Sequence, residues 1–204
     1  MKYRTVLLII IGILCVDQFT KIYVKTHFIL FESFEVFSWF KIVFIENEGM
    51  AWGTKLSDLI PIISSAQAKL LLTLFRIAAV SGIAYWLHTS ISQGKSRILI
   101  SSIAVIFAGA LGNIIDSVFY GLMFQDSFGQ VAQLFPEGGG YANVFYGKVV
   151  DMLHFPIWEG QIPEAIPFIG GKYISFFDPV FNVADVAITS GIGVLLVFNK
   201  KAFK

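Results

Sequence analysis

The residues best suited to chemistry in this sequence are acids and amides that lie near the ends of apolar stretches. Asn182 and Asp185 lie about a turn inside the last apolar segment, and the same Asn-x-x-Asp spacing recurs at Asn113 and Asp116. Residues three apart share one face of a helix, so each pair would present an amide and a carboxylate together. Ionisable groups within apolar segments are costly to bury and are usually functional. We therefore expect the two ends to meet, and Asp185 to have a carboxylate partner there.

Two further acids, Asp17 and Asp151, are candidates for the same place. Asp17 lies in the first apolar segment, and Asp151 lies in the apolar run 149–153, which should be buried. Two close carboxylates cannot both ionise cheaply, so such a pair shares a proton. The ionised member can activate water while the protonated one polarises a carbonyl, which hydrolyses a peptide bond without metal or covalent intermediate. The alternative is that the acids cap helices or pair with Lys21 and Arg76.

The composition places the chain in a membrane. Its 204 residues are 56% hydrophobic and 14% charged, whereas soluble domains carry roughly 25% charged residues. The net charge of +1 argues against nucleic acid as a partner. The lone cysteine, Cys15, excludes a disulfide framework, and the three histidines form no HExxH or Cys/His cluster, so we expect neither metal nor cofactor.

Four apolar segments approach the ~20 residues that cross a bilayer. They cover about 5–24, 69–88, 98–120 and 179–198, and no small-residue cleavage site follows the first. The basic residues crowd three very short segments outside these spans: Lys2, Arg4, Lys95, Arg97, Lys200, Lys201 and Lys204. Such segments face the cytoplasm. We expect one membrane α-helical domain, 1–204, with four transmembrane helices and both termini cytoplasmic.

The two remaining regions, 26–68 and 121–178, should lie outside the cytoplasmic face. The run 37–45 is rich in aromatic and β-branched residues and predicts a small β-sheet on the membrane, with Trp39 and Trp52 at headgroup level. Five of the six prolines fall in the second region, which predicts a long irregular outer loop. Such loops are usually functional or disordered, and the many aromatics here argue against disorder.

Five motifs resemble, in order, those of the bacterial lipoprotein signal peptidases, the signal peptidase II family. They are Asp17-Gln18-Phe19-Thr20-Lys21, an Asn-x-Gly box at 47–53, a third-helix motif at 109–116, and two aspartate boxes at 149–151 and 181–185. Each motif alone is weak, but five in the right order over most of the chain are highly specific. The resemblance implies an aspartyl endopeptidase of the bacterial cytoplasmic (inner) membrane with its active site at the extracytoplasmic face.

Such enzymes remove the signal peptide of a diacylglyceryl-modified prolipoprotein, cutting before the lipidated cysteine. By resemblance, Asp151 and Asp185 would be the catalytic dyad. The residues that support the site or bind substrate would be Asp17, Lys21, Asn47, Gly109, Gly112, Asn113, Asp116 and Asn182. The resemblance also implies membrane lipid as a partner and inhibition by globomycin-type cyclic peptides; we expect a monomer.

Two features depart from the family pattern. The family usually has Arg after the third-helix Asp, where this chain has Ser117. The loss would remove a bidentate donor, for which Arg76 or Lys148 could substitute. Arg76 lies inside the second span, where it either snorkels to the headgroups or pairs with an acid. The insertions 121–147 and 154–178 would form an enlarged lid or an accessory surface.

Two other classes of function compete with hydrolysis. A small proton- or ion-coupled membrane transporter would need charged groups near the middle of several helices and a weak inverted repeat. Here the acids cluster towards one face, and the halves show no convincing repeat. A purely structural membrane protein would leave the Asn-x-x-Asp pairs unexplained.

Overall fold

The computed structural model describes residues 1–48, 64–166, 168–176 and 178–204. Among these residues, three helices are long and apolar enough to cross a membrane: α1 (Tyr3–His27), α3 (Ser65–Ser92) and the continuous helix Arg97–Met123. The third consists of α4 (Arg97–Ile115), the π-helical turn η2 (Asp116–Tyr120) and α5 (Gly121–Met123). These helices contain the predicted spans 5–24, 69–88 and 98–120 and fit a multi-pass membrane protein.

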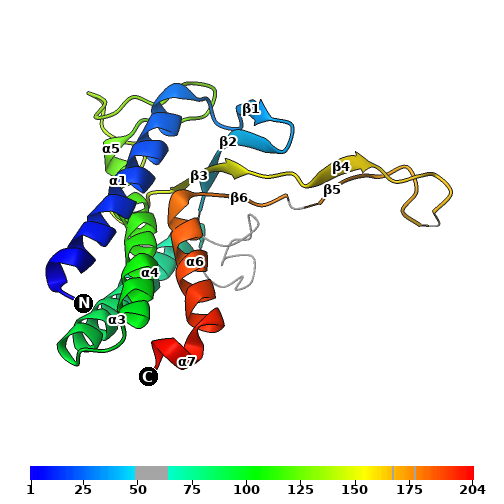
Figure 1. The fold of residues 1–204 in the computed structure, drawn as a ribbon. Coiled ribbons are helices and arrows are strands. Elements are labelled where there is room, and N and C mark those ends of the chain that lie inside the picture. Colours follow the sequence, from blue (N-terminus) through cyan, green and yellow to red (C-terminus); the bar gives the residue numbers. More distant parts are fainter. Residues whose placement is uncertain (49–63, 167, 177) are drawn as a thin grey trace.

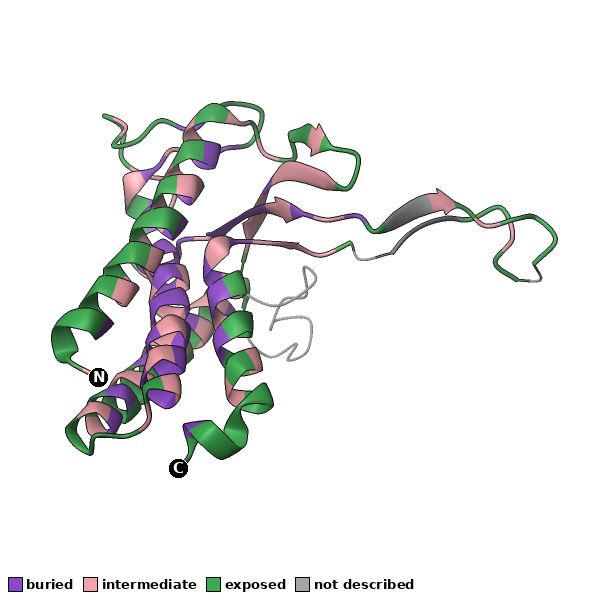
Figure 2. Cartoon of the chain, in the orientation of Figure 1, coloured by how far each residue is buried: buried purple, intermediate pink, exposed green. Residues whose placement is uncertain are grey.

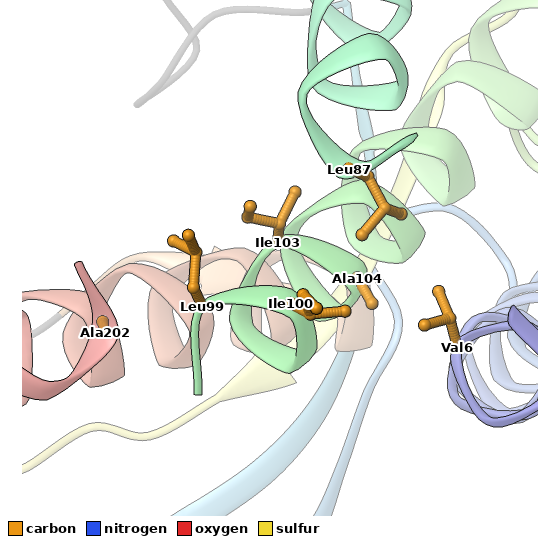
Figure 3. Close-up of a cluster of buried hydrophobic side chains, with 7 residues drawn as sticks. All are labelled: Val6, Leu87, Leu99, Ile100, Ile103, Ala104 and Ala202. Carbon is orange, nitrogen blue, oxygen red and sulfur yellow. The ribbon is translucent and has the colours of Figure 1, made fainter. Parts of the chain in front are cut away.

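Helix α4 is the centre of the bundle and packs against α1, α3 and α6 (Val183–Val197). At the end where both chain termini lie, α7 (Asn199–Ala202) closes the core. Figure 3 shows the buried cluster there, formed by Val6, Leu87, Leu99, Ile100, Ile103, Ala104 and Ala202. The outward sides of α1 and α6 are exposed (Figure 2) and carry apolar residues such as Leu8 and Leu196. Large exposed apolar faces are typical of contact with lipid.

The predicted fourth span, 179–198, requires a correction at its start. Val180–Phe181 form strand β6, and α6 contains 15 residues beginning at Val183. The cause is a capping box: the side chain of Asn182 accepts from the backbone of Asp185, whose side chain accepts from the backbone of Asn182. Asn182 and Asp185 therefore lie at the first turn of the helix, not a turn inside it.

A four-stranded antiparallel sheet lies at the end of the bundle opposite the termini (Figure 1). Its strands, in spatial order, are β1 (Ser33–Phe37), β2 (Phe40–Asn47), β3 (Val149–His154) and β6. The predicted small sheet is thus confirmed, although the run 37–45 contains the turn between β1 and β2. Most of the Asn-x-Gly box at 47–53, including the predicted headgroup residue Trp52, lies outside the described residues.

The region 121–178 is not irregular throughout, as predicted from its prolines. It contributes β3 to the main sheet and forms a second hairpin, β4 (Trp158–Gln161) with β5 (Tyr173–Phe176). This hairpin projects from the bundle as an arm (Figure 1). The segment before β3 has little regular structure, yet it is packed, because Phe124 and Ser127 are fully buried.

Candidate active site

The helix cap at the start of α6 fixes the position of Asp185. The backbone N–H of Asp185 donates to Asn182 Oδ1 at 3.0 Å, and the backbone N–H of Asn182 donates to Asp185 Oδ2 at 3.2 Å. Because both bonds close one turn, the carboxylate cannot swing away without uncapping the helix. Its other oxygen, Oδ1, accepts from Asn113 Nδ2 on α4 at 2.9 Å.

The second acid, Asp151, is held on β3 beside this cap. Its Oδ1 accepts from Asn182 Nδ2 at 2.7 Å, and its Oδ2 accepts from Asn47 Nδ2 on β2 at 3.1 Å. The register explains the second contact, because Asn47 pairs with Val149 and Ile45 with Asp151 on neighbouring strands. Asp151 is 3% exposed. Asn182 therefore contacts both carboxylates, one through its side chain and the other through the helix cap.

A buried ion cluster lies directly behind the two acids. Lys21 Nζ lies 2.9 Å from Asp17 Oδ2 and 2.8 Å from Asp116 Oδ2, and all three side chains have no exposed surface. The same ammonium donates to Asn113 Oδ1 at 2.8 Å. Buried charges persist only when they are paired and hydrogen-bonded. This cluster meets that condition and connects α1 to the end of α4.

The ion cluster also reaches the elements that carry the two acids. Asp17 Oδ1 accepts from the backbone N–H of Ala184 on α6 at 2.9 Å, and Asp116 Oδ2 accepts from that of Val150 on β3 at 3.3 Å. One carboxylate thus holds the helix that begins beside Asp185, and the other holds the strand that contains Asp151.

Two glycines allow the helices to approach this closely. A Cβ on Gly109 would collide with the backbone carbonyl of Ala184 on α6. A Cβ on Gly112 would lie 2.5 Å from Asp17 Oδ2. Small residues at helix contacts let backbones pack closely in membranes. Gly109 and Gly112 therefore determine how near α6 and α1 lie to α4.

The environment of Asp151 changes its acidity. Burial raises its pKa, and the negative charge of Asp185 raises it further, to about 7. The amide donors Asn47 and Asn182 and the charge of Lys21 act in the opposite direction. A carboxyl group that titrates near neutral pH can be protonated beside an ionised neighbour. The pair can then combine a proton donor with a proton acceptor, as general acid–base chemistry requires.

A second buried cluster supports the strand that carries Asn47. Glu46 forms ion pairs with Lys25 and, at 3.1 Å, with Lys148, while Lys25 also donates to Ser127 Oγ at 2.9 Å. Burial raises the pKa of Glu46, but the charges of Lys25 and Lys148 outweigh it and lower the pKa below its ordinary value. The cluster fastens the end of β2 to α1 and to the segment before β3.

The structure brings the predicted site residues into one network. Asp151 and Asp185 lie at its centre, and the supporting residues around them are Asp17, Lys21, Asn47, Gly109, Gly112, Asn113, Asp116 and Asn182. The alternative roles also occur, because Asp17 and Asp116 pair with Lys21 and Asp185 caps a helix. The acids of this network contact β3 and the first turn of α6 at the sheet end of the bundle, unlike the mid-helix groups that a transporter would need.

Three contacts of Gln18 were missed from the sequence. Gln18 Nε2 donates to Asp17 and to Asp116, at 3.0 Å each, and Gln18 Oε1 accepts from Tyr120. The position of Gln18 between Asp17 and Lys21 in the first motif was the available signal.

Of the two cations that could substitute for an arginine at position 117, Arg76 lies beside it. Arg76, half-buried on α3, donates to Ser117 Oγ at 3.4 Å, whereas Lys148 pairs with Glu46 instead.

The chain is similar to known proteins along most of its length. Residues 9–200 match the model of a family described as Signal peptidase (SPase) II. A Porphyromonas gingivalis protein named lipoprotein signal peptidase is 46% identical over 195 residues, covering 95% of this chain and 82% of the relative. A protein of the same name from Amoebophilus asiaticus is 35% identical over 166 residues, covering 81% of this chain and 63% of the relative.

Two solved structures share the fold. Both are described as bacterial membrane enzymes whose structures were obtained by the in meso method. The 1.9 Å structure has a TM-score of 0.61 at 23% identity, covering 98% of this chain and 94% of that chain. The 2.3 Å structure has a TM-score of 0.59 at 22% identity, covering 97% and 89%.

Proposed function

The chain belongs to the signal peptidase II family of aspartic peptidases, and we propose that Asp151 and Asp185 are the pair that activates water in it. The observation that carries this proposal is the contact of Asn182 with both carboxylates. Asp17 and Asp116 are each paired with a lysine. Asp151 instead lies among amides, with a pKa raised to about 7 by burial and by Asp185. That value suits an acid that must give and regain a proton near neutral pH.

The proposed reaction begins with Asp151 protonated and Asp185 ionised. Asp185 accepts a proton from water as the water oxygen bonds to the scissile carbonyl carbon, and Asp151 donates its proton to the carbonyl oxygen. The carbon–nitrogen bond then breaks as the nitrogen takes the proton held by Asp185. One hydroxyl of the intermediate returns a proton to Asp151, so both acids regain their starting states and no covalent intermediate forms.

The remaining residues of the network hold this geometry. Asn113 orients Asp185, and Asn47 orients Asp151. Lys21 pairs with both Asp17 and Asp116, and these two acids anchor α6 and β3 through the backbone N–H groups of Ala184 and Val150. Positions held this rigidly favour catalysis, because the reacting groups need little reorganisation in the transition state.

The substrate in this proposal is a prolipoprotein bearing diacylglycerol on the cysteine that follows the scissile bond. Membrane lipid surrounds the acyl chains, which remain in the outer leaflet and place the cysteine at the acids. The site is at the extracytoplasmic face of the bacterial cytoplasmic (inner) membrane, and the enzyme acts as a monomer. A globomycin-type cyclic peptide would occupy the same site and inhibit it.

We also propose that α6 is the fourth span of one domain, with both termini in the cytoplasm. Both termini lie at one end of the bundle, as an even number of crossings requires (Figure 1). Its 15 residues extend about 22 Å, less than the ~30 Å of hydrocarbon. If α7 lies at the cytoplasmic headgroups, the first turn of α6 is below the outer surface. Asp185 would then lie where lipid-anchored substrate can reach it.

A processing assay tests the proposal. Purified protein in detergent micelles is mixed with a diacylglyceryl-modified prolipoprotein, and the product is followed by gel mobility with and without globomycin. We expect cleavage that globomycin blocks and that Asp151→Asn and Asp185→Asn each abolish in folded protein. Turnover retained by a purified Asp185→Asn variant would refute the assignment of the pair.

A further inference from the structure

An arginine from α3 reaches the active-site end of α4. Arg76 Nη1 donates to the hydroxyl of Ser117 at 3.4 Å, and that hydroxyl donates to the backbone carbonyl of Asn113 at 2.9 Å. Asn113 in turn binds Asp185. Ser117 is fully buried and immediately follows Asp116. The hydroxyl group of Ser117 thus connects the guanidinium of Arg76 to the turn of α4 that contains Asn113, the residue that binds Asp185.

The electrostatic surroundings of Arg76 point to the same place. The carboxylates that act on its charge are those of Asp185, Asp151 and Asp116, with Asp185 the strongest. A half-buried guanidinium near acids is costly to maintain inside a membrane helix and is usually functional. The nearby lysines have other roles, because Lys21 pairs with Asp17 and Asp116, and Lys148 with Glu46.

The proposed substrate has backbone carbonyl groups that need a hydrogen-bond donor near the scissile bond. An apolar signal segment in the membrane satisfies its backbone by forming a helix, but the scissile peptide must unwind to reach two acids. Each carbonyl released from the helix then lacks a partner, which is costly where few water molecules can replace the lost hydrogen bond. A guanidinium has five donors in a planar fork, so it can bind a carbonyl while it keeps its contact with Ser117.

We propose that Arg76 is a substrate-binding residue that donates to a main-chain carbonyl of the unwound signal-peptide segment beside the scissile bond. This inference rests on the proposed function of Asp151 and Asp185. In this assignment the small side chain of Ser117 makes room for a guanidinium that arrives from α3 rather than from α4. Arg76 therefore acts mainly on substrate affinity, whereas the two aspartates act on the chemical step.

The test compares kinetics and binding for a lipopeptide that carries diacylglyceryl cysteine and flanking fluorophores. Arg76→Ala should raise KM about 10- to 100-fold, as the loss of a charge-assisted hydrogen bond does, with a smaller change in kcat. Arg76→Lys, which retains the charge but not the fork, should fall between. The control Arg97→Ala removes an exposed arginine at the other end of α4 and should change neither constant.

Moving the guanidinium separates binding from structural support. In Arg76→Ala with Ser117→Arg, the new arginine starts from the residue that Arg76 contacts and can use the vacated space. KM should recover at least about tenfold relative to Arg76→Ala alone if a guanidinium at this spot binds substrate. The proposal would be overturned if the loss of activity in Arg76→Ala is fully explained by a smaller folded fraction and the double variant does not recover KM.

Binding in an inactive background makes the two proposals separable. Lipopeptide affinity is measured by fluorescence anisotropy in Asp185→Asn and in Asp185→Asn with Arg76→Ala. We expect Arg76→Ala to raise Kd by the same factor by which it raises KM. An unchanged Kd would refute the role of Arg76 and leave the catalytic pair intact. Turnover retained by Asp185→Asn itself would refute the catalytic pair instead.

Discussion

The side-chain amide of Asn182 donates a 2.7 Å hydrogen bond to Asp151, a residue 31 positions earlier in the chain. The same asparagine is the N-cap of α6 and exchanges two hydrogen bonds with Asp185. One side chain therefore joins a strand acid to a helix acid. The distance between the two acids depends on a helix cap, which is a local feature, and on the pairing of β3 with β6, which is not.

Replacing Asn182 should separate these two roles. Ser can cap a helix nearly as well as Asn but is too short to reach Asp151, so Asn182→Ser should preserve the cap of α6 while lowering kcat about 10- to 100-fold. Asn182→Ala should lose the cap too, at a further cost of about 1 kcal/mol. Thermal unfolding and lipopeptide turnover in micelles measure both. Full activity in Asn182→Ser would show that the bond to Asp151 is not required.

The titration of Asp151 should appear in the pH dependence of stability. Burial, followed by the charge of Asp185, raises its pKa from 3.8 to about 7. At pH values between these two pKa values, the folded protein holds a proton that the unfolded chain releases. The free energy of unfolding therefore falls as pH rises, by up to about 4 kcal/mol. Asp151→Asn carries no titrating group there and should lack this slope. The exposed control Glu137→Gln should retain it.

Activity should follow the same titration. If the protonated form of Asp151 is the acid, kcat falls as pH rises through about 7, and the apparent value belongs to the pair with Asp185. The pH profile of kcat for the lipopeptide provides the measurement. A kcat that stays constant over about two pH units either side of neutrality would exclude Asp151 as the proton donor.

The sequence predicted the long helices because uninterrupted apolar runs leave few alternatives in a membrane. It missed the start of α6 because Val180 and Phe181 are apolar and suit either a helix or a strand. Only their pairing with β3, formed by a distant segment, decides between the two. Prolines similarly suggested an irregular loop where β4 and β5 pair, since the strand partner is not visible in local composition.

The candidate site was likewise predicted only in part from the sequence. The motifs identified the acids and amides, since ionisable groups in apolar runs are conspicuous. They did not show that Asn182 would link the two acids, and they left Arg76 and Lys148 as alternatives at Ser117, because such contacts depend on how helices pack. Gly109 was predicted as a residue that supports the site or binds substrate, and the structure adds that its neighbour is the carbonyl of Ala184.

Gly109 should tolerate no side chain. A methyl group there would collide with the carbonyl of Ala184, which lies on the backbone of α6 and cannot move aside alone. Gly109→Ala should therefore lower stability by about 1–3 kcal/mol, as overpacking does, and reduce turnover by displacing the first turn of α6. Gly82→Ala on α3 is the matched control, since a Cβ there meets nothing within 4 Å. Equal behaviour of the two variants would contradict the packing described for Gly109.

The second buried cluster, formed by Lys25, Glu46, Lys148 and Ser127, should affect activity although it does not contact the two acids. Lys25→Met leaves buried Glu46 without one of its ion partners, and loss of one member of a buried pair costs about 3–5 kcal/mol. Lys148→Met should cost less, because the Lys148 side chain is 27% exposed and its pairing is weakened by solvent. Since Asn47 follows Glu46 on β2 and binds Asp151, the first variant should also lower kcat. Combining Lys25→Met with Glu46→Gln removes both charges and should restore part of the stability. If Lys25→Met lowers stability without changing kcat, the cluster supports the fold but does not position Asn47.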